Sequence, residues 1–353
     1  MLVGASGKTI YFSSQPIDGE GTWFSPVFSV AGAIDEDVTG MTVQDGSVVI
    51  FGRQGIWITA GEPPADNATS GGLATPRKLA VDLGCVNANS ILTTGVGTFF
   101  QSDRGLQLLS RGHTVEAIDK FQDQLDTYPV ITSAVLDTRN GRAIFSLASS
   151  QTDGVASTNG KDVVLDLTRG SWVSVDDKRG GVATQATQDA CMAFIDDAWR
   201  YAWLATDGTV YYERDTDDAS AHLDGSSWVT QRAITSWVHI AGIQGEQFID
   251  QVLLLAKRHT GHDLTISLAF DYSDSFTSTK TFTATQIAAL ARQWLVKEIS
   301  QTTSQAVRVM VEDATPSSGT VGTGKGSTWV ALTFSGHPHQ KVKRTSAAQR
   351  GGS

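Results

Sequence analysis

The sequence has few cysteines, few charged side chains and no long hydrophobic run. Only Cys85 and Cys191 are present, which is too few for a disulfide framework, so we expect two buried free thiols. No stretch approaches the roughly 18 apolar residues of a membrane-spanning helix. Residues 1–8 lack the charged start and apolar stretch of a signal peptide. We therefore expect a soluble protein that is made in a cytoplasm.

Positive charge is also scarce. The net charge is −10 over 353 residues, and charged side chains make up only 18% of the chain. A protein that holds DNA tightly needs surplus Lys and Arg to neutralise phosphates, so tight DNA binding is disfavoured. An acidic surface still suits a protein past which DNA slides.

Common catalytic and metal-binding motifs are missing as well. The chain has no phosphate-binding loop, no His-Glu-x-x-His, no Gly-x-Ser-x-Gly and no Cys-x-x-Cys. Two places could hold a metal: His259, His262 and Asp263, or His337 and His339. The more common role of such residues is in solvated turns and strands, so the metal sites are the weaker alternative. Other aspartates lack the EF-hand spacing and are expected in solvated turns: Asp35, Asp37, Asp176, Asp177, Asp196 and Asp197. We expect no catalytic residues, no metal and no cofactor.

Glycine is abundant, with 35 residues, and glycines separate the apolar runs of the sequence. Residues 47–58 and 97–109 each consist of an apolar strand, a polar turn that contains Arg and ends in Gly, and a second apolar strand. This pattern predicts a hairpin with a residue at the turn that is able to take a positive φ. Residues 203–212 hold a looser copy, and the glycines at 55, 105 and 208 lie 50 and 103 residues apart. A hairpin that recurs about every 50 residues predicts stacked or radially arranged sheets, most commonly a β-propeller.

The chain divides into two predicted domains and a tail. We expect about four or five blades in a β-propeller-like domain at residues 1–232, as a closed ring or as an incomplete or split one. Strands become longer and less regular after the acidic joint at 215–220, which predicts an antiparallel β-sandwich at 233–340. The predicted fold class is therefore all-β, with one short helix in the sandwich.

Helical spacing occurs twice. Four apolar residues in the first domain recur at near-helical spacing and predict a short helix: Val115, Ile118, Phe121 and Leu125. In the sandwich, Thr285 is the expected N-cap of the second helix. The predicted apolar face of that helix carries four residues: Ile287, Leu290, Ala291 and Trp294.

Basic residues gather near the C-terminal end. The loop at 316–328 is rich in glycine, and residues 340–353 carry four basic side chains and no acid, which leaves −14 on the rest of the chain. We expect both segments to contact a neighbouring subunit. The predicted contact residues are Lys325, Lys341, Lys343, Arg344 and Arg350.

The alternative is a host-surface propeller that binds or cleaves glycans. Asp18, Thr22 and Trp23 partly match the aspartate box of sialidase-like propellers, although Pro16 and Glu20 occupy its Ser and Gly positions. Five tryptophans also offer sugar-stacking surfaces, although packing in the core is their more common role: Trp57, Trp172, Trp199, Trp203 and Trp228. A pocket lined by several carboxylates and arginines would favour this alternative.

Several segments resemble a known family. Residues 84–91 (Gly-Cys-Val-Asn-Ala-Asn-Ser-Ile) and 95–106, together with the early segments 10–14 and 22–23, resemble the blades of phage tail hub or nozzle proteins, the tail stabilisation proteins of short-tailed phages. Residues 242–245 and 271–273, with two later strand segments, are similar to the sandwich that follows such propellers. The later segments are 307–309 and 312–313. The resemblance covers most of the chain and brings no catalytic residues.

The resemblance implies a structural virion protein, not an enzyme. Such a protein forms part of a homo-oligomeric ring in the phage tail, channels the genome during ejection and is made in the bacterial host cytoplasm. Implied partners are other tail or head-tail connector proteins, receptor-binding proteins, and double-stranded DNA that passes without sequence-specific binding. A cellular propeller scaffold is a third alternative, because propellers host many functions.

Overall fold

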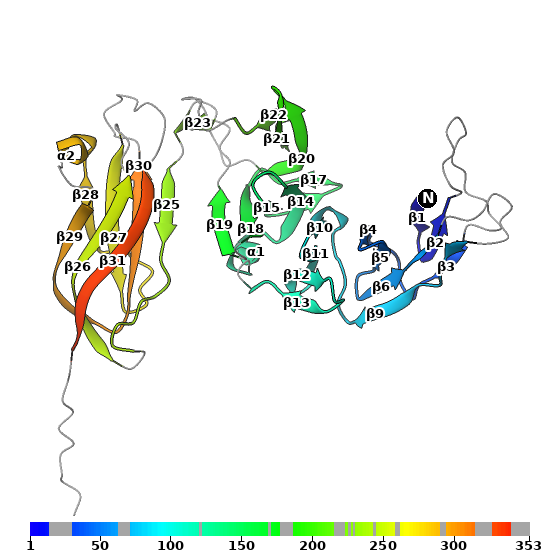
Figure 1. The fold of residues 1–353 in the computed structure, drawn as a ribbon, viewed down its shortest axis with the longest axis horizontal. Helices are drawn as coiled ribbons and strands as arrows, with labels where there is room; N and C mark the ends of the chain where they lie inside the picture. The colour runs from blue at the N-terminus through cyan, green and yellow to red at the C-terminus, as the bar shows by residue number, and fades with distance from the viewer. Residues whose placement is uncertain are drawn as a thin grey trace, which may run out of the picture. The chain divides into compact units, whose positions relative to one another are not determined.

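The described residues form mostly antiparallel strands and two short α-helices, so the predicted all-β class is confirmed (Figure 1). A computed structural model describes residues 1–13, 30–62, 71–119, 122–168, 171–176, 186–214, 223–224, 227–228, 230–242, 245–257, 262–289, 294–314 and 327–339. Two compact units are present, Met1–Glu213 and Arg214–Ser353. The boundary between the two units therefore lies after Glu213, earlier in the chain than the boundary predicted at residue 232.

In the described part of the first unit, five antiparallel sheets of three or four strands follow one another along the chain, and two of them carry a two-stranded ribbon. The first sheet contains β1 (Val3–Ser6), β2 (Thr9–Phe12) and β3 (Val30–Ala33). The second contains β4 (Gly40–Gln44), β5 (Ser47–Phe51), β6 (Gly55–Thr59) and β9 (Arg77–Val81), with the ribbon β7 (Gly61–Glu62) and β8 (Gly72–Leu73). The third contains β10 (Leu92–Thr94), β11 (Gly97–Ser102), β12 (Gly105–Ser110) and β13 (Val115–Ala117), preceded by the 3-10 turn η1 (Ala88–Ser90).

The fourth and fifth sheets complete the unit. The fourth contains β14 (Val130–Asp137), β15 (Arg142–Ala148), β18 (Gly160–Asp166) and β19 (Ser171–Asp176), with the ribbon β16 (Gln151–Thr152) and β17 (Val155–Ala156). The fifth contains β20 (Thr187–Ile195), β21 (Ala198–Ala205) and β22 (Val210–Tyr212). Each sheet is an up-and-down meander, which is the strand arrangement of a propeller blade.

The internal strands are buried on both faces because their side chains alternate between two neighbouring sheets. In β5, Val48 and Ile50 pack toward the first sheet, whereas Val49 and Phe51 pack toward the third. The same alternation divides the buried residues of β11, β15 and β18 between two clusters. Since successive strand residues point to opposite faces, burial of both faces requires the continuous apolar runs that the sequence contains.

The hydrophobic clusters join each sheet to the next one along the chain. Four clusters connect the first sheet to the second, the second to the third, the third to the fourth and the fourth to the fifth. Among the described residues, no cluster joins the first sheet to the fifth. The sheets are therefore stacked along the chain, whereas propeller blades and a closed ring stay predictions.

The hairpin glycines differ from one another in conformation. Gly105 and Gly208 take positive φ angles of 94° and 86°, as predicted for the turn. Gly55 does not take a positive φ. A Cβ atom on Gly55 would lie 2.5 Å from the ring of Trp57 and 3.0 Å from the Glu36 carboxylate, so close packing explains the absence of a side chain.

Gly84 lies between β9 and η1, against the turn that joins β5 and β6, and this gives a test of the packing there. A Cβ atom at Gly84 would lie 2.2 Å from the carbonyl oxygen of Gly52, which is a backbone atom and cannot rotate away. We expect Gly84→Ala to lower the free energy of unfolding by about 1–3 kcal/mol, as overpacking does. Thermal unfolding measures the change. Gly95→Ala is the matched control, because nothing lies within 4 Å of a Cβ at Gly95, and an equal loss in both variants would contradict the packing explanation.

The short helices differ from the prediction in their extent. In the first unit the helix α1 spans Gln122–Thr127, whereas Val115 begins the strand β13, because Val115 pairs with Leu109 in the third sheet. Leu125 is the buried residue of α1, and Phe121 lies outside the described residues.

In the second unit α2 spans Ala284–Ala289, and its cap is Thr283 rather than Thr285. The Thr283 hydroxyl accepts from the amide of Gln286, and the Gln286 side chain accepts from the amide of Thr283, which is a capping box. Leu290 and Ala291 lie outside the described residues, and Trp294 begins the strand β29, so it is not part of the helix.

The second unit is a β-sandwich of two sheets. One sheet has the order β25 (Gln231–Ile234), β30 (Val307–Ala314), β27 (Asp263–Phe270) and β28 (Ser278–Phe282). The other has the order β29 (Trp294–Ser304), β26 (Glu246–Lys257) and β31 (Thr328–His339). A two-stranded ribbon of β23 (Leu223–Asp224) and β24 (Ser227–Trp228) precedes them. A single cluster of aliphatic and aromatic side chains from both sheets forms the core between them.

Candidate functional sites between the sheets

Polar side chains inside the strands connect each sheet to the backbone of its neighbour. Between the second and third sheets, Gln44 is only 2% exposed. Its amide donates to the carbonyl of Ser110 at 3.0 Å, and its oxygen accepts from the Thr98 hydroxyl at 2.6 Å. A buried side chain with both ends satisfied fixes the position of one sheet against the next.

Gln101 makes the equivalent connection between the third and fourth sheets. Its amide donates to the carbonyl of Pro129 at 2.5 Å, and its oxygen accepts from the amide of Ile131 at 3.1 Å. Asn87 adds a bond of 2.7 Å to the carbonyl of Ile131. These three bonds hold the start of β14 against the third sheet.

The fourth and fifth sheets are joined in the same way by hydroxyl groups. Thr132 donates to the carbonyl of Thr187 at 2.6 Å, and the Ser133 hydroxyl accepts from the amide of Ala190 at 3.1 Å. Both hydroxyl groups lie at the bulge of β14, where the register shifts between Ile131 and Ser133. Three successive interfaces between sheets therefore combine an apolar cluster with side-chain bonds to backbone.

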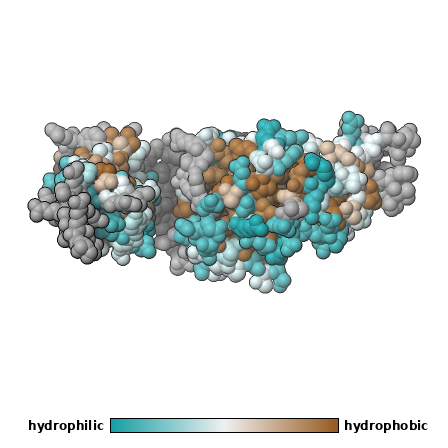
Figure 2. Space-filling model, turned by 90° about the horizontal axis from the view of Figure 1, so that it is seen from below, coloured by the Kyte–Doolittle hydropathy of each residue, from teal (hydrophilic) through white to brown (hydrophobic). Residues whose placement is uncertain are grey.

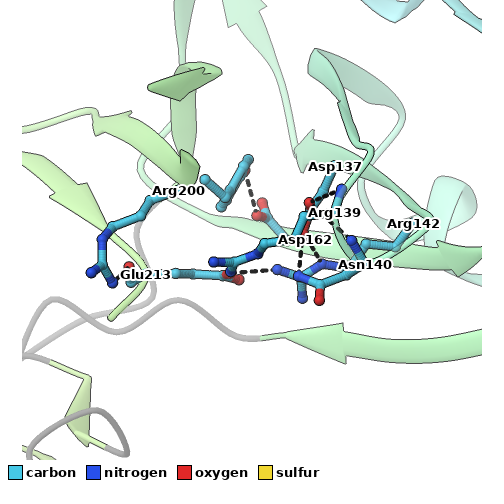
Figure 3. A network of polar contacts seen from close by, with 8 residues as sticks. Asp137, Arg139, Asn140, Arg142, Asp162, Arg200 and Glu213 are labelled. Atoms are coloured by element: carbon cyan, nitrogen blue, oxygen red, sulfur yellow. Dashed lines mark hydrogen bonds and ion pairs between the residues drawn. The ribbon is translucent and has the colours of Figure 1, made fainter. Parts of the chain in front are cut away.

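A network of charged groups ties the fourth sheet to the last residue of the first unit (Figure 3). Asp137 is 1% exposed, and its carboxylate accepts from Arg142 at 2.8 Å and from Asn140 at 2.7 Å. Arg142 also pairs with Glu213. Burial opposes ionisation of Asp137, but the bonds from Arg142 and Asn140 outweigh it and hold its pKa below the usual range.

A second buried contact connects the fourth and fifth sheets beside this network. The Tyr201 hydroxyl donates to the Asp162 carboxylate at 2.9 Å, and both residues are 2% exposed. Burial, with the nearby charge of Asp162, raises the pKa of Tyr201 well above its usual value. Tyr201 therefore stays protonated and serves as a fixed donor.

A hollow of about 270 Å³ lies at the turns of the second and third sheets. The two hairpins that the repeat pattern identified meet there, and Arg53 pairs with Asp103 at 3.1 Å. Asp82, which has a positive φ of 61°, and Arg104 also line the hollow. The remaining lining residues are Gln54, Leu83 and Gly84. Two arginines and two carboxylates thus surround a space large enough for a small polar ligand.

The residues predicted to contact other subunits lie outside the described residues, so their role stays a prediction. These are Lys325, Lys341, Lys343, Arg344 and Arg350. The aspartate-box residues Asp18, Thr22 and Trp23 also lie outside the described part of the chain.

Two of the histidines singled out in the sequence, His262 and His337, make separate contacts, whereas His259 lies outside the described residues. His262 is buried, and its Nδ1 lies 2.9 Å from the Asp313 carboxylate, whereas Asp263 accepts from the amide of Ala284. His337 lies on β31 and contacts Asp250 at 3.5 Å. Within the described ranges, no three His, Cys, Asp or Glu side chains form a group that could hold a metal.

Two predictions about buried residues need correction. Cys85 is a buried free thiol as expected, but Cys191 is exposed, because it lies on the face of the fifth sheet opposite to the core residues Ala190 and Met192. Trp57 is buried, whereas Trp199 is 56% exposed.

The polar residues that connect the sheets were not predicted from the sequence. Gln44, Gln101 and Asp137 each lie within or directly after an apolar strand, in a position where a polar residue needs a partner. A polar residue that interrupts an otherwise continuous apolar run is therefore the sequence feature that could have identified them.

Comparisons with known proteins identify no family for this chain. No protein-family model and no curated protein matches the sequence. Among solved structures, a chain of the S. cerevisiae core factor is similar over 90% of this chain and 54% of its own length, with 10% identity and a TM-score of 0.32. This chain therefore spans about half the length of that protein. Among the described residues, no helix combines the length and apolar character needed to cross a membrane.

Proposed function

We propose that the chain is a structural component of a phage tail, a subunit of a hub or nozzle ring that channels the genome during ejection and anchors neighbouring tail proteins. The observation that carries the proposal is the first unit: consecutive meander sheets, internally buried on both faces and joined by side-chain bonds to backbone. Such a unit resists deformation, because one sheet cannot slide without breaking both an apolar contact and several hydrogen bonds.

The charge of the chain supports the same function. A net charge of −10 repels the phosphates of passing DNA and disfavours its retention. The surface of the first unit in Figure 2 mixes hydrophilic teal areas with hydrophobic brown ones, and hydrophobic areas on a surface favour contacts with other proteins. The proposed partners are copies of this chain, connector proteins and receptor-binding proteins, and the proposed role is not enzymatic.

Two measurements test the proposal. Native mass spectrometry of the full chain should give a closed oligomer, and cryo-electron microscopy of purified virions should place the chain as a ring at the tail. Strictly monomeric protein that is also missing from the virion would overturn the proposal.

A second candidate function is favoured by the hollow between the second and third sheets. Two arginines and two carboxylates are the kind of lining that we expect of a glycan-binding propeller, because they can bond to several hydroxyl groups at once. A glycan array probed with the full chain tests this function. Binding that is lost in Arg104→Ala and kept in Arg111→Ala would support it, since Arg111 pairs with Asp45 elsewhere on the surface. An array without any bound glycan would remove this candidate.

A further inference from the structure

The tip of the hairpin formed by β20 and β21 exposes two large aromatic side chains. Phe194 and Trp199 are opposite each other in the strand register and are 61% and 56% exposed. Their rings meet edge to face, with centroids 5.8 Å apart. Exposed aromatic side chains that lie together are typical of binding sites for other proteins, because their burial supplies much of the binding energy.

The two-residue turn between these strands adds negative charge. Asp196 and Asp197 have φ angles of 49° and 59°, so both central residues have the positive φ that a type I′ turn requires. Asp tolerates this conformation better than most residues, although Asn-Gly is the usual choice. The Tyr212 hydroxyl lies 3.4 Å from the Asp196 carboxylate. The tip therefore presents two carboxylates beside two aromatic rings.

The hairpin also contains a cation, Arg200, but its guanidinium lies beneath the turn and not beside the exposed carboxylates of the tip. Arg200 is 6% exposed, and its guanidinium donates to the carbonyls of Ile195 and Glu213 beneath the turn. The tip thus favours a partner that combines positive charge with long aliphatic stems.

We infer that this hairpin tip binds the basic C-terminal tail of a second copy of the chain. The inference rests on the proposed ring, and it names the contact between adjacent subunits. The described part of the chain ends at His339 in β31, and the following residues 340–353 include Lys341, Lys343, Arg344 and Arg350 without any acid. Lys and Arg side chains can pair with the carboxylates and lie over the ring of Trp199. A tip that receives the tail of the next copy is a heterologous contact, which is the kind that closes rings.

Complementary variants test the contact in the full chain. The tip variant carries Asp196→Asn and Asp197→Asn, which removes both charges while Asn keeps the positive φ. The tail variant carries four substitutions to Gln, at Lys341, Lys343, Arg344 and Arg350. Each variant alone should self-associate about tenfold more weakly than the wild type in sedimentation velocity, because several exposed ion pairs and a cation–π contact are lost together.

A mixture of the two variants distinguishes a second copy from the same chain. The tip variant keeps a normal tail and the tail variant keeps a normal tip, so the mixture should form pairs that neither variant forms alone. Absence of mixed pairs overturns the contact between copies, since a tail that folds back on its own chain gains nothing from mixing.

Two controls complete the experiment. Trp199→Ser should weaken association as the charge variant does, whereas Val210→Ser, at a side chain of the same sheet that is 65% exposed, should leave it unchanged. If the wild type forms rings and both variants form them equally well, this inference is wrong while the proposed structural function stands. A wild-type chain that stays monomeric overturns this inference, and it overturns the proposed function as well if the chain is also missing from the virion.

Discussion

Replacement of Phe100 by Ala should lower the free energy of unfolding of the first unit by about 3–5 kcal/mol, the range for truncation of a buried Phe. Phe100 is fully buried between the second and third sheets, and its ring centroid lies 4.9 Å from that of Phe51. The surrounding side chains come from two rigid sheets and cannot collapse into the space, so the cavity remains.

Hydrogen exchange measures this effect sheet by sheet. Amides of β5, β6, β11 and β12 should exchange faster in Phe100→Ala, while amides of β26 and β27 in the second unit keep their protection. Val210→Ala is the matched control, because a side chain that is 65% exposed contributes little to packing. Unchanged protection in β5 and β11 would show that the two sheets do not depend on this contact.

Replacement of Arg142 by Met should have the second largest effect, a loss of about 2–4 kcal/mol at neutral pH. The substitution leaves Asp137 buried without its cationic partner and also releases Glu213. The expected loss lies slightly below the usual range for a broken buried pair, because Asn140 and two backbone amides still donate to the Asp137 carboxylate. Arg111→Met is the control, because Arg111 and its partner Asp45 are both exposed and their pairing should have no measurable effect on stability.

The same substitution predicts a pH dependence of stability. The folded-state pKa of Asp137 is lowered, so its contribution is fully present above the unfolded value of about 3.9 and is lost as the pH falls through the folded value. The difference between wild type and Arg142→Met should therefore be largest near neutral pH and shrink below about pH 4. Urea unfolding at several pH values measures it. A difference that stays constant down to acid pH would mean that Arg142 acts through packing instead of charge.

Much of the fold could be predicted from the sequence because strands and hairpins depend on nearby residues. The apolar runs of β5 and β11, the polar turns and Gly105 identified the hairpins, and the recurrence of the hairpin identified consecutive sheets. The caps and ends of the helices were predicted less well. Val115 extends a sheet because it pairs with Leu109 across a turn, and helical spacing alone cannot exclude such a pairing.

The candidate sites could not be predicted in the same way. Gln101 contacts Pro129, 28 residues away, and Arg142 contacts Glu213, 71 residues away. The exposure of Trp199 and Cys191 likewise depends on which face of the fifth sheet packs against the fourth. Only the repeated Arg-containing turn anticipated a site, since the turns at Arg53 and Arg104 do meet at the hollow.

Residue order and composition are enough to predict an all-β chain with repeated hairpins in its first part, longer strands in its second and a basic C-terminal tail. These properties follow from local alternation, turn residues and composition. The packing of the sheets, in contrast, selects which polar residues join them, which charges are buried and which aromatic side chains stay exposed. The physical reason is that these contacts join residues far apart in the chain, and their energies depend on burial, which exists only after the sheets have packed.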